Sequence, residues 1–182
     1  MPLPGLDDGQ VKRAVTQIAA YISGQRQLHL AAAEPLAPET RAELSRFFRR
    51  ATLDSVRTRV LQGEKVQNPP FYSELYGMGF SAGSLPDISA MTAITFVDVV
   101  AFHEPITTDV LSHELVHAVQ YELLGLAKFA ELYVMGFLSG GSYEEIPLEM
   151  HAIALGNRFE ADRTMGFSVH DEVQRLVNSG LY

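Results

Sequence analysis

The chain has 182 residues, with 14 Lys and Arg against 22 Asp and Glu, which gives a formal net charge of −8. This acidic balance argues against general nucleic-acid binding, which needs cationic side chains to displace phosphate counterions. Apolar residues make up 47% of the chain, which is enough to form a core, and there is no Cys. Disulfides, Cys-ligated zinc, iron–sulfur clusters and thiol catalysis are therefore excluded, and a metal ion would need His, Asp or Glu as ligands.

The length suits one domain, residues 1–182, with an N-terminal part (1–88) and a second part (89–182). The N-terminus lacks the basic and apolar regions of a signal peptide. The most apolar stretch, Leu123–Leu138, is interrupted by Lys128 and Glu131 and is shorter than the roughly 20 residues that cross a bilayer. We expect a cytoplasmic protein that binds neither membranes nor nucleic acid.

In the first part, apolar residues at helical spacing predict a helix over about residues 8–23 that ends at Gly24. Pro38 begins a second predicted helix, which runs through Phe47 and Phe48. Alternating apolar and polar residues over 56–60 predict a strand. The segment 67–86 is rich in Gly, Pro and Ser and is expected to be a loop with room for one short helix.

In the second part, the β-branched run Met91–Phe102 predicts a strand. A helix capped by Thr107 or Thr108 is expected to end at Gly125, and another apolar helix covers 126–138. Further helices are expected over about 147–164, opened by a proline, and over 171–178. Helices and strands are mixed without regular βαβ alternation, so we expect an α+β fold that is mainly helical with a small sheet.

The sequence His113-Glu114-Leu115-Val116-His117 lies inside the capped helix. Residues four apart share one helix face, so both imidazoles can bind the same metal ion. Glu114 lies roughly 100° around the helix, where it can reach a water near the ion without binding the ion itself. Two metal ligands and a general base on one helical turn are typical of sites that carry out metal-assisted hydrolysis.

A catalytic zinc site needs a third ligand, and the position that would supply a third His in an extended motif is Leu123. The third ligand must therefore be a carboxylate further along the chain. We favour Glu149, on the helix that begins near Pro147, with Glu145 and then Glu144 as alternatives.

Other polar residues are weaker candidates for the site. Tyr143 could donate a hydrogen bond to a developing oxyanion, although a packed tyrosine is the alternative interpretation. Tyr133 and His151 are similar but weaker candidates. We interpret Gln120 as a solvated helix residue, although its position would also let it support the metal site.

The run Leu111–Tyr121, followed by Glu149-x-x-Ala152, resembles gluzincin zinc metallopeptidases and small bacterial zincin-like domains of unknown function. The resemblance covers about residues 90–165. It implies a zincin-like fold in which an active-site helix carries His113 and His117 as ligands and Glu114 as general base, and a later helix carries Glu149 as third ligand. It also implies that Met91–Phe102 lines the substrate cleft. The 31 residues between His117 and Glu149 are a longer spacing than in the compact gluzincins.

These observations predict a zinc-dependent metallopeptidase that acts on a peptide or protein substrate. Two alternatives stay open at this point. One is a catalytically silent zincin-like domain with a binding or regulatory role, and the other is a zinc hydrolase of a non-peptide amide.

Overall fold

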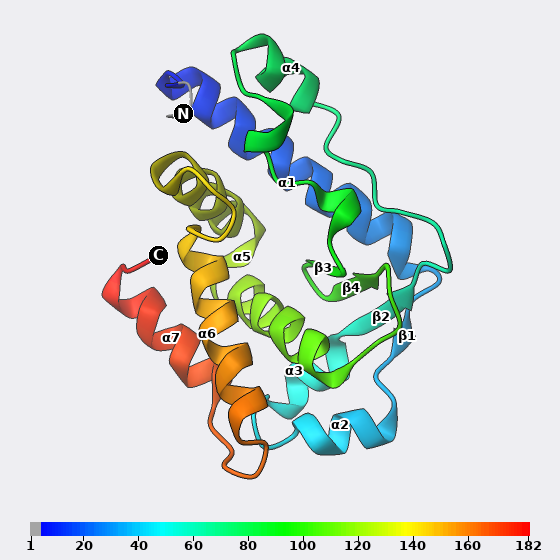
Figure 1. The fold of residues 1–182 in the computed structure, drawn as a ribbon. Helices are drawn as coiled ribbons and strands as arrows, with labels where there is room; N and C mark the ends of the chain where they lie inside the picture. The colour runs from blue at the N-terminus through cyan, green and yellow to red at the C-terminus, as the bar shows by residue number, and fades with distance from the viewer. Residues whose placement is uncertain (1–4) are drawn as a thin grey trace.

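The structure is a computed structural model that describes residues 5–182, and in it helices surround one small sheet (Figure 1). The fold is α+β, as predicted from the sequence. In chain order its elements are α1 (Asp8–Leu30), β1 (Glu34–Pro35), α2 (Pro38–Leu44), α3 (Arg50–Ser55), β2 (Arg57–Val60), α4 (Tyr72–Gly77), two short 3₁₀ turns (Ala82–Ser84 and Ile88–Ala90), β3 (Ala93–Phe96), β4 (Val99–Phe102), α5 (Thr108–Gly140), α6 (Pro147–Ala161) and α7 (Val169–Ser179).

The four strands lie in the order β1-β2-β4-β3. β2 and β4 are parallel, with Arg57 opposite Val99, and the other two pairs are antiparallel. Every residue of β4 is buried, because α1 and the neighbouring strands cover it. β3 is one edge of the sheet and packs against α5. This arrangement places the edge of the sheet beside the helix that carries both candidate histidine ligands.

The predicted single strand Met91–Phe102 is wrong, because this segment is a hairpin of β3 and β4. The chain reverses at Val97 and Asp98, and Val97 has a φ of +64°, a conformation that β-branched residues rarely adopt. Arg26 of α1 holds the turn through two hydrogen bonds to the carboxylate of Asp98, one of them 2.8 Å long. The partner that fixes the turn lies 72 residues away, so local sequence gives no sign of it.

Two predicted helix ends in the N-terminal part are also wrong. α1 continues past Gly24 to Leu30, because later residues make long-range contacts: Arg26 binds Asp98, and His29 is buried. The second helix ends at Leu44 rather than Phe48, and the separate helix α3 was not expected.

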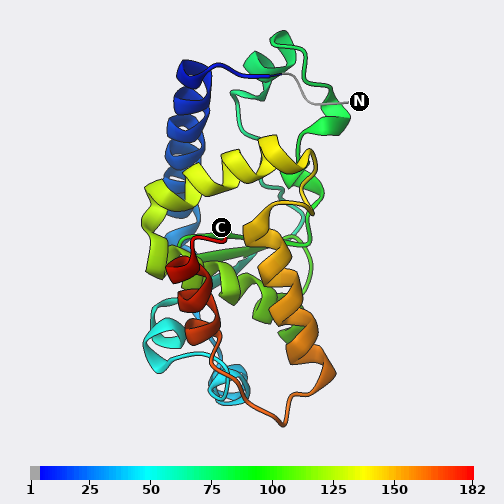
Figure 2. The same ribbon diagram turned by 90° about the vertical axis from the view of Figure 1, so that its left-hand side faces the viewer.

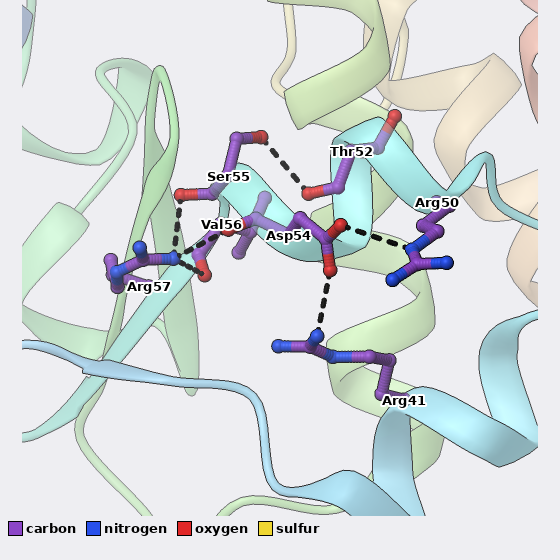
Figure 3. Close-up of polar contacts among 7 residues, drawn as sticks. All are labelled: Arg41, Arg50, Thr52, Asp54, Ser55, Val56 and Arg57. Atoms are coloured by element: carbon purple, nitrogen blue, oxygen red, sulfur yellow. Dashed lines mark hydrogen bonds and ion pairs between the residues drawn. The ribbon is translucent and has the colours of Figure 1, made fainter.

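Polar contacts join α2, α3 and β2 near the surface (Figure 3). The Asp54 carboxylate accepts hydrogen bonds from Arg41 (2.7 Å) and Arg50 (3.4 Å), and we call these three residues the Asp54 cluster. Nη1 of Arg57 donates to the carbonyl oxygens of the three preceding residues at 2.8, 3.1 and 2.9 Å. Arg57 therefore satisfies carbonyl groups that the end of α3 leaves without helical partners.

α5 is the central helix of the fold. α6 and α7 lie along one side of it and the sheet lies on the other, as both ribbon views show (Figures 1 and 2). Thr107 caps its N-terminus through a hydrogen bond from the Val110 amide. The predicted break at Gly125 is confirmed, because this residue has non-helical angles (φ +73°, ψ +159°) inside the long helix. The second half of α5 therefore turns toward α1, which it crosses in Figure 2.

The C-terminal helices differ slightly from their predicted ranges. α6 ends at Ala161 rather than near Thr164, because Oδ1 of Asp162 accepts a 2.8 Å hydrogen bond from the Thr164 amide and turns the chain. By length and composition α5 could cross a membrane. The core helices of soluble proteins meet the same criteria, so length and composition do not distinguish a membrane-spanning helix from a core helix.

Candidate metal centre

The structure brings His113, His117 and Glu149 together at the contact between α5 and α6. The two Nε2 atoms are 3.2 Å apart. Oε2 of Glu149 lies 3.3 Å from Nε2 of His117 and 3.6 Å from Nε2 of His113. Three possible ligand atoms thus lie close together, and the cluster could hold a metal ion.

These distances can be compared with those of a tetrahedral zinc site. Ligand atoms at 2.0–2.1 Å from a tetrahedral ion are about 3.3–3.4 Å from one another. The three separations in this cluster, 3.2, 3.3 and 3.6 Å, are within a few tenths of an ångström of that spacing. An ion of this size and geometry therefore fits without rearrangement of the helices.

Glu149 is buried, and within residues 5–182 its Oε2 atom makes no hydrogen bond. Burial raises the pKa of Glu149, but the facing imidazoles outweigh burial and hold this pKa well below its ordinary value. Burial likewise lowers the pKa of His117, but the Glu149 carboxylate outweighs it and raises the pKa of His117 to about 9. A buried carboxylate oxygen without a hydrogen bond is costly, and a cation bound between these groups would satisfy it.

The return of α6 onto α5 depends on two glycines near the end of α5. A Cβ atom on Gly136 would lie 2.7 Å from the Pro147 ring, and one on Gly140 would lie 2.6 Å from Cβ of Glu145. Glycine at these positions allows the first turn of α6, which carries Glu149, to approach α5 closely. Glu144 and Glu145, the alternative ligands, are exposed and lie outside the cluster.

Gln120 was expected to be solvated, and this prediction is wrong, because Gln120 is completely buried. Its Nε2 atom donates to the Leu148 carbonyl at 3.0 Å, so its Oε1 atom faces His117 and accepts from Nδ1 at 2.8 Å. A proton held on Nδ1 leaves the Nε2 lone pair of neutral His117 free for a metal ion. The i, i+3 spacing from His117 is the sequence signal for this contact.

Tyr182 is a residue that sequence analysis missed. Its hydroxyl accepts from Nε2 of Gln120 at 3.4 Å and lies 2.6 Å from Nδ1 of His151, to which it can donate. His151 therefore contacts Tyr182 rather than the candidate ligands. A chain of polar contacts runs from His117 through Gln120 to Tyr182 and His151.

Glu114 is buried beside the cluster, and Thr95 of strand β3 fixes its carboxylate. The Thr95 hydroxyl lies 2.7 Å from Oε2 of Glu114 and can donate to it. Thr95 contacts only this oxygen of the carboxylate, so Oε1 could accept a proton. Sequence analysis also missed Thr95. Glu114 lies 19 residues later on another element, so no local pattern predicts their contact.

The candidate centre separates two spaces. An open groove of about 310 Å³ lies outside and is lined by His113, Glu114 and the beginning of β3. A smaller cavity of about 70 Å³ lies inside and is lined by His117, Glu114 and Glu149. Glu114 borders both spaces.

Tyr143 and Tyr133, two candidates from the sequence, are among the tyrosines that line the inner cavity. Tyr143 borders both the groove and the cavity, and burial together with the negative charge of Glu149 raises its pKa well above the ordinary value. Its phenol is therefore held protonated, as a hydrogen-bond donor must be. Tyr133 lines only the inner part, and burial likewise raises its pKa.

Comparison of the chain with protein-family models, with curated proteins and with solved structures gives no match.

Proposed function

We propose that this protein is a zinc-dependent peptidase in which His113, His117 and Glu149 hold the ion and Glu114 is the general base. The observation that carries the proposal is the spacing of the three ligand atoms at 3.2, 3.3 and 3.6 Å, with a buried carboxylate beside them. Two His and one Glu are a ligand set of catalytic zinc sites, and three protein ligands leave one position open.

Zinc bound in such a site supplies a Lewis acid and lowers the pKa of bound water to about 7. The protein's own residues would supply orientation and proton transfer. Thr95 holds one oxygen of Glu114, so the other oxygen would take the proton of the attacking water and pass it to the leaving amine. Tyr143, which lines both the groove and the cavity, would donate to the developing oxyanion.

The outer groove favours a peptide over a small amide. Met91, Thr92 and Ala93 line it at the beginning of β3, which is an edge of the sheet. An edge strand has backbone groups free to pair with an extended chain, so a peptide can lie along it as an added strand. Such pairing would carry the scissile bond past Glu114 and the ligand cluster.

The test begins with elemental analysis of the tag-free protein. We expect about one zinc per chain in the wild type. The variant Glu114→Gln should retain zinc but lose hydrolysis of a peptide library, because it keeps the shape of the side chain and removes the base. Retained turnover in this variant would contradict the proposed mechanism. A zinc-loaded wild type that cleaves no peptide would favour a binding domain instead.

A further inference from the structure

We infer that His103 is a positioning residue for the peptide substrate. Its side chain fixes the chain just before β3, so that the free edge of this strand is ordered for pairing with the main chain of the peptide. The identity of the ligand rests on the proposed function, whereas the ordering of the edge rests on the hydrogen bonds of His103 itself. His103 directly follows β4 and is half-buried.

The hydrogen bonds of the His103 ring determine which nitrogen carries the proton. Nε2 lies 2.9 Å from the backbone amide of Val66, which can only donate. Nε2 is therefore the acceptor, and the proton of the neutral imidazole is on Nδ1. Nδ1 contacts the carbonyl oxygen of Met91, which can only accept. The ring thus links a donor on one side to an acceptor on the other, and both of its nitrogens are occupied.

The segment on the far side of the ring is firmly anchored. The Val66 side chain is buried in the core. Two residues later, Oδ1 of Asn68 accepts a 2.8 Å hydrogen bond from the Ile88 amide. The chain around Val66 and the chain that leads to Met91 are therefore joined twice, once by Asn68 and once by His103. This makes Val66 a fixed point from which the ring can hold Met91.

His103 also holds the next carbonyl group along the chain. Its backbone N–H donates to the carbonyl oxygen of Thr92 at 2.9 Å. In a trans peptide the C=O and N–H groups point in opposite directions, so the N–H of Ala93 points away from β4. The register agrees, because antiparallel positions alternate between bonded and outward-facing, and Ala93 lies opposite Phe102, next to the bonded pair. One residue thus fixes two successive carbonyl groups and the direction of an outward N–H.

This outward N–H lies where a peptide would bind. Met91, Thr92 and Ala93 all line the outer groove beside the candidate metal centre. A peptide added to the edge of β3 would accept a hydrogen bond from Ala93 through one of its carbonyl groups. An edge that is ordered in advance loses less conformational entropy on binding. His103 therefore contributes to the affinity for extended peptides rather than to the chemical step.

The experiment compares two variants that each keep one half of the contact. His103→Asn has an amide nitrogen near the position of Nδ1, so it can still donate to Met91. His103→Gln has an amide oxygen near the position of Nε2, so it can still accept from Val66. Each variant loses one hydrogen bond to a backbone group, so we expect similar losses of stability, measured by urea unfolding.

The kinetic test uses the zinc-loaded proteins and a hexapeptide that the wild type cleaves. We expect KM to rise roughly 3- to 10-fold in His103→Gln, the equivalent of about one hydrogen bond, while kcat changes by less than about twofold. His103→Asn should keep the KM of the wild type. A blocked dipeptide, which is too short to lie along β3, should give the same KM in all three proteins. Equal KM values for the hexapeptide in the two variants, or an equal rise for the dipeptide, would overturn the inference and leave the proposed function intact.

Two NMR measurements on the full chain need no catalysis. Long-range proton–nitrogen spectra of the wild type should show the proton of His103 on Nδ1, and a proton on Nε2 would overturn the inference even if neither variant folds. Backbone amide order parameters of Thr92 and Ala93 should be near about 0.85 in the wild type and in His103→Asn, and fall toward about 0.6 in His103→Gln. Unchanged order parameters in His103→Gln would overturn the inference whether or not the protein binds zinc. Failure of the wild type to cleave peptides would instead contradict the proposed function.

Discussion

The candidate metal centre and the Asp54 cluster each place a carboxylate beside nitrogen-bearing side chains, but the first is buried and the second is exposed. In the candidate metal centre the Glu149 and His117 side chains are 5% and 7% exposed. In the Asp54 cluster (Figure 3) the Asp54 and Arg50 side chains are 43% and 91% exposed. Both groups make contacts of about 3 Å, so distance alone does not distinguish them.

Burial determines how much such contacts contribute to stability. Exposed ion pairs contribute about 0–1 kcal/mol, because water screens the charges and the side chains lose entropy. Buried polar groups carry a large desolvation cost, so the loss of one partner is expensive, and a network is favourable only when each member is satisfied. We therefore expect substitutions to have large effects at the candidate metal centre and small ones in the Asp54 cluster.

The largest effect is expected for Glu149→Gln. The amide has almost the shape of the carboxylate but lacks its charge and is a poor ligand for zinc. We expect zinc affinity, measured by competition with a chelator, to fall by more than the roughly 100-fold that the loss of a supporting hydrogen bond costs. Glu145→Gln is the matched control on an exposed side chain and should bind zinc like the wild type. A larger loss in the control than in Glu149→Gln would place the third ligand at Glu145.

A smaller effect is expected for Gln120→Leu, which removes the acceptor that orients His117. Zinc affinity should fall by about 10- to 100-fold, the usual cost of losing a partner of a metal-bound histidine. Tyr182→Phe should cost less, because its contact with Gln120 is 3.4 Å long. Tyr76→Phe, on an exposed tyrosine, should have no effect. Unchanged affinity in Gln120→Leu would show that packing alone orients the imidazole.

These residues also show how far the sequence could predict the site. The two histidines share a helix face by spacing alone, and Pro147 and Gly125 mark a helix start and a break that the structure contains. The burial of Gln120 could not be predicted, because its partners are the Leu148 carbonyl and the Tyr182 hydroxyl, 28 and 62 residues later. Local sequence patterns predict on which face of a helix or strand a residue lies. They do not predict which distant residues pack against that face.

The same limit explains the errors in the fold. The turn places the β-branched residue Val97 at a positive φ, and its second residue, Asp98, is bound by Arg26 from α1. The continuation of α1 past Gly24 depends on the same contact and on the burial of His29. In both places a tertiary interaction overrides local propensity, as is common when a segment is strongly anchored elsewhere.

A pH-dependent effect is expected at His29, which is buried and stacks on Phe96. Burial, and then the positive charge of Arg59, lower the pKa of His29 in the folded state. The unfolded chain therefore takes up this proton more readily, so stability is full above about pH 6.5 and falls as the pH drops below that value. Urea unfolding at pH 7.5 and 5.0 should show a smaller loss in His29→Phe, which keeps a ring on Phe96, than in the wild type. The same loss in both proteins would contradict this assignment.

The smallest effect is expected for Asp54→Asn in the exposed cluster. The substitution keeps the size of the side chain and removes the charge that faces Arg41 and Arg50. We expect the free energy of unfolding to fall by about 0.2–1 kcal/mol at low salt and by less in 1 M NaCl, where the screening length is only about 3 Å. The end of α3 should stay intact, because Arg57 binds the backbone carbonyls rather than this carboxylate. A loss above about 2 kcal/mol that persists in high salt would mean that exposure does not determine the strength of these contacts. The contrast between exposed and buried contacts, on which the expected order of effects depends, would then be wrong.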